Sequence, residues 1–270
     1  MKIYCFIFAF MLCHKLFSEN LDQQFTHHNP IEISLMDTSG LDPKLKQFLD
    51  SFYQRNFSNY ETIKGIKSIQ YIGTYKINEK EAGTIKIIKK RPNKYKSYIK
   101  DKNDIEVITI YDGETLKSGK KTSRAPTIVW QTVDENDPKN SWIHNNKIFD
   151  SILLNPSDPD KKISLGIAYL EEGRVIQPIT IELKNVLKIT NLVSMRDNLI
   201  KESLIEFKNQ EDPKLGNYNI YFEDYELANG IMTPKKITTK LYDGTIVVYE
   251  FTDIQINLGI SDFFFKAISL

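Results

Sequence analysis

The sequence predicts a mainly β protein in which one large antiparallel sheet is covered by helices. Ten segments rich in Ile, Val, Tyr and Thr alternate roughly by two, as half-buried strands do. Hairpin-like turn signals separate them, and two further stretches have helical spacing instead. About ten consecutive strands joined by short turns indicate a meander, which forms a sandwich, a barrel or one strongly curved sheet.

The beginning of the chain predicts export. Residues 3–13 form an uncharged apolar run directly after Lys2. This run is shorter than the roughly 20 residues that span a bilayer, but it suits the hydrophobic core of a secretory signal. We therefore expect residues 1–18 to be a signal peptide cut after Ser18, with an uncleaved anchor as the alternative. Residues 19–40 are expected to be a flexible leader, and residues 41–270 a single domain.

Cysteine and charge content narrow the class of protein. Cys5 and Cys13 both lie inside the predicted signal, so the mature chain is expected to have no disulfide and no cysteine-based metal site. Lipidation of Cys13 would need a small residue before it, whereas Leu12 stands there. The 36 Lys and Arg nearly balance the 35 Asp and Glu. A nucleic-acid partner is therefore not expected, because such binders normally carry a strong basic excess.

The two helical stretches are expected to cover one face of the sheet. The first spans about residues 42–57, where Asp42 can cap a helix and Pro43 fits its first turn. The second spans residues 137–156 and lies between the two groups of strands. The apolar positions that follow helical spacing include Leu45, Phe48, Leu49 and Phe52 in the first, and Trp142, Ile148, Ile152 and Leu153 in the second.

The expected strands follow one another along most of the chain. Breaks such as Asn78–Lys80, Arg91–Asn93 and Asp243–Gly244 have the residues of tight turns. The strands are predicted near residues 64–77, 82–91, 94–101, 104–111, 174–184, 186–194, 198–208, 217–227, 232–242 and 245–257.

Catalytic and metal-binding signatures are missing from the sequence. It has no Gly-rich phosphate loop, no nucleophile elbow and no His-Glu-x-x-His helix. His144 is the one histidine after the leader, and the acidic residues 134–137 lack the spacing of a calcium loop. The acidic run 223–226 is typical of a solvated strand face. We therefore expect no enzyme activity, no catalytic residue, no metal and no cofactor.

Apolar and aromatic side chains recur on one side of the first four strands. Their ordinary interpretation is a sheet core packed on two helices. Taken together, they also predict an apolar cavity, because two short helices leave much of a curved sheet uncovered. The candidate cavity residues are Ile69, Tyr71, Tyr75, Ile85, Ile87, Tyr95, Ile99, Val107 and Tyr111.

Two short motifs resemble the outer-membrane lipoprotein carrier (LolA-like) family. Lys90-Arg91-Pro92-Asn93 closes one strand and opens the next, and Asp112-Gly113-Glu114-Thr115-Leu116 follows about twenty residues later. The C-terminal runs 222–225, 229–234, 254–257 and 262–264 resemble larger lipoprotein-sorting members of the same superfamily. The resemblance extends from about residue 41 to residue 265. Lys117, where the family often has an aromatic residue, departs from the pattern.

The resemblance implies a half-open antiparallel β-barrel of about 10–11 strands with helices as a lid over its concave face. It also implies a periplasmic, monomeric carrier of acylated lipoproteins or lipids, which accepts cargo from an inner-membrane donor and delivers it to an outer-membrane acceptor. The family's strand-end arginine, which latches the lid, falls on Arg91. Trp142, Ile148, Ile152 and Leu153 would belong to the lid. The alternative is a non-transporting regulatory or structural binding module on the same fold.

Overall fold

The computed structural model describes residues 37–58, 64–134, 153, 156, 158–183, 187–207 and 217–267. All of them belong to the larger of the chain's two units, residues 35–270. The predicted signal peptide 1–18 and most of the predicted leader lie outside the described residues. No helix within the described part of the chain is long and apolar enough to cross a membrane.

A single antiparallel sheet of 14 strands dominates the fold, which confirms the mainly β prediction. One α-helix, α2 (Pro43–Asn56), precedes the sheet, and a short 3-10 helix, η2 (Asp262–Phe265), follows it. The strands are β1 (Ser68–Ile77), β2 (Lys80–Lys90), β3 (Lys94–Asp101), β4 (Glu106–Tyr111), β5 (Leu116–Lys121), β6 (Val129–Thr132), β7 (Lys161–Leu165), β8 (Tyr169–Glu171), β9 (Arg174–Leu183), β10 (Leu187–Ser194), β11 (Leu199–Phe207), β12 (Tyr218–Ala228), β13 (Ile231–Leu241) and β14 (Ile246–Ile256).

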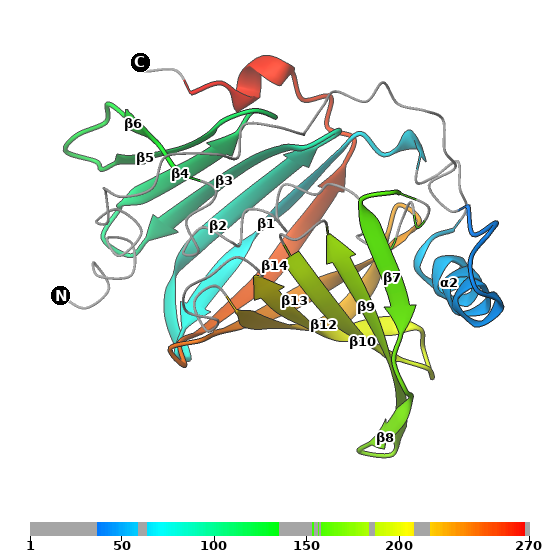
Figure 1. Cartoon of the computed structure of the whole chain (residues 1–270). Helices are drawn as coiled ribbons and strands as arrows, with labels where there is room; N and C mark the ends of the chain where they lie inside the picture. The colour runs from blue at the N-terminus through cyan, green and yellow to red at the C-terminus, as the bar shows by residue number, and fades with distance from the viewer. Residues whose placement is uncertain are drawn as a thin grey trace. The chain divides into compact units, whose positions relative to one another are not determined.

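The sheet consists of two meanders joined by its first and last strands. Its order is β6-β5-β4-β3-β2-β1-β14-β13-β12-β11-β10-β9-β7, with β8 paired to β9. β1 and β14 lie side by side near the middle of this order (Figure 1). Because β6 and β7 end the order without pairing to each other, the sheet is open rather than a closed barrel.

All ten predicted strands are present, and the prediction of 10–11 strands is wrong only in number. The strands missing from the prediction are β5, β6, β7 and β8. β5 reads Leu-Lys-Ser-Gly-Lys-Lys and carries little of the alternating apolar pattern. β6 and β8 have four and three residues, which is too short for a pattern of period two to stand out.

The predicted first helix is confirmed as α2. The Asp42 carboxylate caps it by accepting hydrogen bonds from the backbone N–H of Lys44 (3.0 Å) and Leu45 (3.3 Å). At the other end, Asn56 Nδ2 donates to the backbone oxygen of Asn198 at 2.8 Å, which ties the helix to the β10–β11 turn. The helix is therefore fixed by its own cap and by the sheet.

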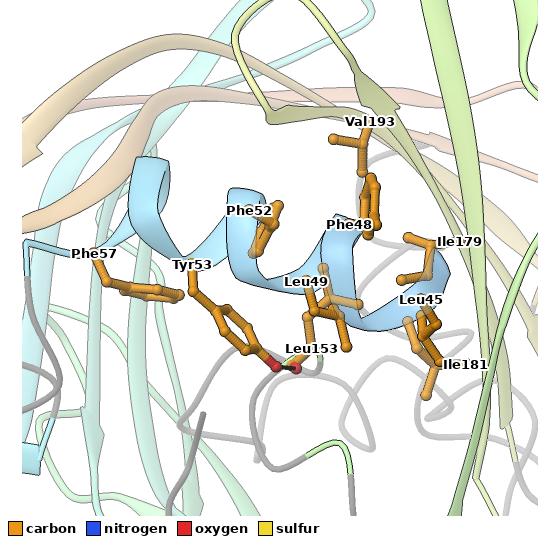
Figure 2. Close-up of a cluster of buried hydrophobic side chains, with 10 residues drawn as sticks. All are labelled: Leu45, Phe48, Leu49, Phe52, Tyr53, Phe57, Leu153, Ile179, Ile181 and Val193. Atoms are coloured by element: carbon orange, nitrogen blue, oxygen red, sulfur yellow. Dashed lines mark hydrogen bonds between the residues drawn. The ribbon is translucent and has the colours of Figure 1, made fainter. Parts of the chain in front are cut away.

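The apolar side of α2 packs on one face of the sheet, which we call the inner face. Leu45, Phe48, Leu49, Phe52 and Tyr53 belong to a buried cluster that includes residues of β9 and β10. Figure 2 shows Leu45 and Phe48 beside these sheet residues, and Tyr53 pointing to Leu153. The sheet residues of this cluster are Ile179, Ile181 and Val193, and Leu153 joins it. Burial of these apolar surfaces, at about 25 cal/mol per Å², stabilises the docked helix.

The C-terminal segment packs on the opposite, outer face of the sheet. Phe265 is fully buried there among Ile88, Ile108 and Ile110. Lys90 Nζ donates to the Asp262 carboxylate and to the Ile260 backbone oxygen, both at 2.6 Å. The sheet therefore has apolar packing on both faces, with α2 on one and η2 on the other.

The predicted second helix, residues 137–156, lies outside the described residues except for Leu153 and Pro156. Both of these are buried. Trp142, Ile148, Ile152 and His144 also lie outside the described residues.

Candidate functional site

Aromatic and aliphatic side chains gather on the inner face where the two meanders meet. Tyr75, Ile85 and Phe251 form a buried core there. We call it, with its partly buried neighbours, the inner aromatic cluster. Those neighbours are Tyr71, Ile77, Ala82, Ile87, Ile99, Ile237, Val247, Tyr249 and Ile254.

Strand register explains why these side chains share one face. Tyr71 lies opposite Ile87 on β2, and Ile85 lies opposite Ile99 on β3. Directly opposed residues on antiparallel strands point to the same side of the sheet. The Tyr71 and Phe251 rings lie 5.1 Å apart between centroids, a contact distance for aromatic pairs. The cluster therefore crosses the junction between the meanders.

The structure brings most of the predicted cavity residues together. Tyr71, Tyr75, Ile85, Ile87 and Ile99 belong to the inner aromatic cluster. Two more predicted residues, Tyr95 and Tyr111, pack beside it with Leu116 and Ile87.

The two remaining predicted cavity residues lie nearby on the same face. Ile69 is paired with Lys89, and Val107 with Ile99. Both are partly buried and belong to neither cluster. The grouping expected from the sequence is therefore present, whereas acyl binding by these residues stays a proposal.

β14 and β13 also contribute to this cluster, which the sequence did not predict. Tyr249 and Phe251 stack with an interplanar angle of 4°, and Ile237 pairs with Tyr249 from the next strand. The alternation of Val247, Tyr249 and Phe251 marks one strand face. What the sequence lacks is any local sign that this face continues onto β1.

Tyrosine hydroxyls give this apolar face a polar component. Burial raises the pKa of Tyr71 to about 12. Burial, reinforced by Tyr95 and Tyr75, also raises the pKa of Tyr249. Among the residues that the structure describes, the buried hydroxyl of Tyr218 on β12 has no hydrogen-bond partner. A buried polar group without a hydrogen bond is costly in a protein core. The inner face therefore offers a hydrogen-bonding group as well as apolar surface.

One lysine also belongs to the inner face. Lys89 lies between Ile69 on β1 and Tyr95 on β3, both of which it opposes in register. Burial lowers the pKa of Lys89 to about 8, because the charged ammonium is poorly solvated there. A cation is therefore held near the edge of the inner aromatic cluster at neutral pH.

The two motifs that carry the family resemblance contact each other. Asn93 Nδ2 donates to the backbone oxygen of Gly113 at 3.3 Å. Arg91 follows directly after β2, and its Nη1 donates to the backbone oxygen of Lys64 at 3.1 Å. Arg91 thus links the end of β2 to the segment before β1. Its predicted role as a latch for the lid stays a proposal.

Leu153 is the predicted lid residue that the structure describes. Its side chain is fully buried against α2, and its backbone oxygen accepts a hydrogen bond from the Tyr53 hydroxyl (Figure 2). Burial raises the pKa of Tyr53, so this hydroxyl stays protonated and able to donate. Leu153 therefore packs in the cluster between α2 and the sheet, and its predicted role in a lid stays a proposal.

The acidic run 223–226 lies at the surface, as the sequence predicts. Glu223 pairs with Lys236 at 2.8 Å, and Glu226 pairs with Lys235 at 3.3 Å. Within the described ranges, no group of three or more His, Cys, Asp or Glu side chains is arranged to hold a metal ion.

Comparison with known proteins identifies the fold. No protein-family model and no curated protein matches the sequence. A DUF1329 family protein from Desulfovibrio piger has a similar structure, with a TM-score of 0.56 at 12% identity, covering 82% of this chain and 97% of that one. A putative outer membrane lipoprotein-sorting protein domain from Vibrio parahaemolyticus gives a TM-score of 0.51 at 6% identity over 81% and 94%. The fold is therefore shared with these two proteins.

The shared fold bears out the expected architecture, a mainly β antiparallel sheet that stays open. A LolA superfamily protein from Nitrosomonas europaea matches with a TM-score of 0.44 at 10% identity, covering 83% of this chain and 97% of that one. Likeness at such low identities shows the scaffold alone, so the ligand has to be argued from the site.

Proposed function

We propose that this chain is a periplasmic carrier that shelters acyl chains of a lipoprotein or lipid on its inner face and passes them toward the outer membrane. The inner aromatic cluster carries this proposal, because it forms an apolar surface that continues across both meanders. Exposing a 16-carbon acyl chain to water costs on the order of 12 kcal/mol. A carrier therefore needs an extended apolar surface rather than a few contacts.

The proposed site must open before it binds. Tyr75, Ile85 and Phe251 are only 4–7% exposed in this structure. An acyl chain would therefore reach them only after the inner face is uncovered. Arg91 is the proposed latch of this movement, and Arg91→Leu is expected to weaken closure and trap cargo. Unchanged transfer of cargo by the variant would contradict the latch.

Two experiments test the carrier proposal. The protein is purified under native conditions, and co-purified lipids and acylated peptides are identified by mass spectrometry. A photoactivatable fatty acid is then crosslinked to the protein, and the labelled peptides are mapped. We expect labels on inner-face positions such as Tyr71, Ile99 and Phe251. Labels confined to outer-face positions, or a protein that stays empty in both experiments, would overturn the proposal.

The burial of the inner aromatic cluster also supports a second candidate. If the protein's own side chains fill this face permanently, the chain is a non-transporting regulatory or structural module. Crosslinking separates the two, because a permanently filled face gives no acyl label even at high probe concentration.

A further inference from the structure

Positive charge is concentrated in one half of the sheet. Residues 64–134, which include β1 to β6, carry 16 Lys and Arg against 8 Asp and Glu. The whole chain has 36 against 35, so the remainder is net acidic. A separation of this size within one sheet creates a directional field that attracts anions to one end of it.

Many of these lysines point to the outer face. The register of β2, β3, β4 and β5 places alternate residues on that side of the sheet. One of these outward residues is acidic, Glu106. The outward lysines of these strands are Lys86, Lys90, Lys94, Lys96, Lys100, Lys117 and Lys121.

Four of these seven lysines form ion pairs with nearby carboxylates; Lys100 pairs with Asp104 at 2.8 Å and Lys121 with Glu106 at 2.6 Å. Asp262 binds both Lys90 and Lys94, at 2.6 Å and 2.8 Å. Considering the described residues alone, neither Lys86 nor Lys117 forms an ion pair with a carboxylate. Surplus positive charge therefore remains on this face.

The positive charges of Lys86 and Lys96 repel each other. Burial, and after it repulsion from Lys86, lowers the pKa of Lys96. Lys96 Nζ also lies 4.2 Å from the centroid of the Phe264 ring and donates to the Phe264 backbone oxygen. An external anion would relieve this repulsion, because it offsets the like charges.

Exposed apolar side chains lie beside these lysines. Phe263 is 63% exposed and Leu258 is 44% exposed. Both line a hollow of about 410 Å³ whose wall includes Lys86 and Ile88. The segment that carries them is held in place by the buried Phe265. Phe263 is thus presented on a fixed support rather than on a loose tail.

We propose that Lys86, Lys96 and Lys117, with Phe263 and Leu258, form a docking surface for an anionic phospholipid bilayer. Lysines attract the headgroup phosphates, while an aromatic and an aliphatic side chain enter the headgroup region. Two apolar side chains among lysines suit this shallow insertion better than a protein partner, which buries about 800 Å² of each surface. Docking through the outer face leaves the inner face uncovered by the bilayer.

The docking surface is tested by sedimentation of the protein with lipid vesicles. We expect binding to vesicles of phosphatidylcholine mixed with phosphatidylglycerol, and weak binding to phosphatidylcholine alone. High salt should release the protein, because it screens exposed charges. Lys86→Ala and Lys117→Ala should each weaken binding about fivefold, the effect of removing one cation near an anionic surface. Phe263→Ala should also weaken binding to the mixed vesicles, because it removes an inserted aromatic side chain.

Lys240→Ala is the matched control, since Lys240 is exposed on β13 in the other half of the sheet. It removes the same charge and should leave binding unchanged. Equal losses for Lys240 and Lys86 variants would reduce the effect to net charge and overturn the docking surface. Absence of binding to anionic vesicles would also overturn it. Neither outcome bears on the carrier proposal, which the acyl crosslinking experiment tests separately.

Discussion

Gly73 is a position at which the sheet leaves no room for a side chain. An added Cβ would lie 2.0 Å from the Glu250 backbone oxygen and 2.8 Å from the Phe251 Cα. Both atoms belong to the backbone of β14, so Gly73→Ala forces β1 and β14 apart. The register of this pair already shifts between Ile72 and Gly73, which brings the strands close at this point.

The expected loss in the free energy of unfolding follows from the contacts that the substitution disrupts. Separating the strands weakens about two ladder hydrogen bonds, each worth about 1 kcal/mol net. It also disturbs the Tyr71–Phe251 ring pair, worth about 1 kcal/mol. With the packing lost around them, we expect Gly73→Ala to lower the free energy of unfolding by about 3–5 kcal/mol.

Equilibrium urea unfolding followed by circular dichroism measures this loss. Gly65→Ala is the matched control, because an added Cβ there has no atom within 4 Å. The control should stay within about 0.5 kcal/mol of the wild type. Equal urea midpoints for the two variants would refute the argument that β14 blocks a side chain at position 73.

Three further predictions concern the two faces of the sheet. Tyr53→Phe leaves the Leu153 carbonyl without its buried hydrogen-bond donor and should lower the free energy of unfolding, measured with urea, by about 1–3 kcal/mol. A loss no larger than that of Tyr242→Phe, at an exposed tyrosine, would contradict this. The pKa of Lys89 falls from 10.5 to about 8 on folding, so its contribution to stability should rise with pH between 8 and 10.5. Lys89→Met should remove that slope and raise the free energy of unfolding by up to about 3 kcal/mol at pH 7. If the slope persists in the variant, other groups cause it. Hydrogen bonds from Lys90 and Lys94 lower the pKa of Asp262 to about 2, so the stabilising effect of Asp262 should persist above pH 3.8 and vanish as the pH falls through 2. Asp262→Asn should speed amide hydrogen exchange in residues 258–267 at neutral pH. Unchanged exchange would show that apolar packing alone holds this segment.

The sequence predicts those elements whose signals are local. Asp42 and Pro43 mark the start of α2, and the alternation along each long strand marks ten strands. β5 escapes prediction because its sequence is polar, and its pairing with β4 is made by the backbone. Backbone hydrogen bonds are available to any residue except proline, so they leave no mark on the sequence.

The candidate site is predictable on one side of the junction only. Residues of β1 to β4 could be grouped from their alternation, because neighbouring hairpins fix their register. The partners on β14 could not, since Ile69 pairs with Ile256 across nearly the whole domain. Packing of Phe265 on the outer face was likewise hidden, because three consecutive phenylalanines match neither the helical nor the strand period.

The pairing of β1 with β14 also has a consequence for the order of folding. Each meander joins strands that are adjacent in sequence, so both can form early from local hairpins. The junction between them closes a loop of well over a hundred residues, and loop-closure entropy makes this step late. Until β14 pairs with it, β1 has one unpaired edge, and it carries Ile69, Tyr71 and Ile72. A chain still being synthesised would therefore be most prone to aggregate before its last strand is complete.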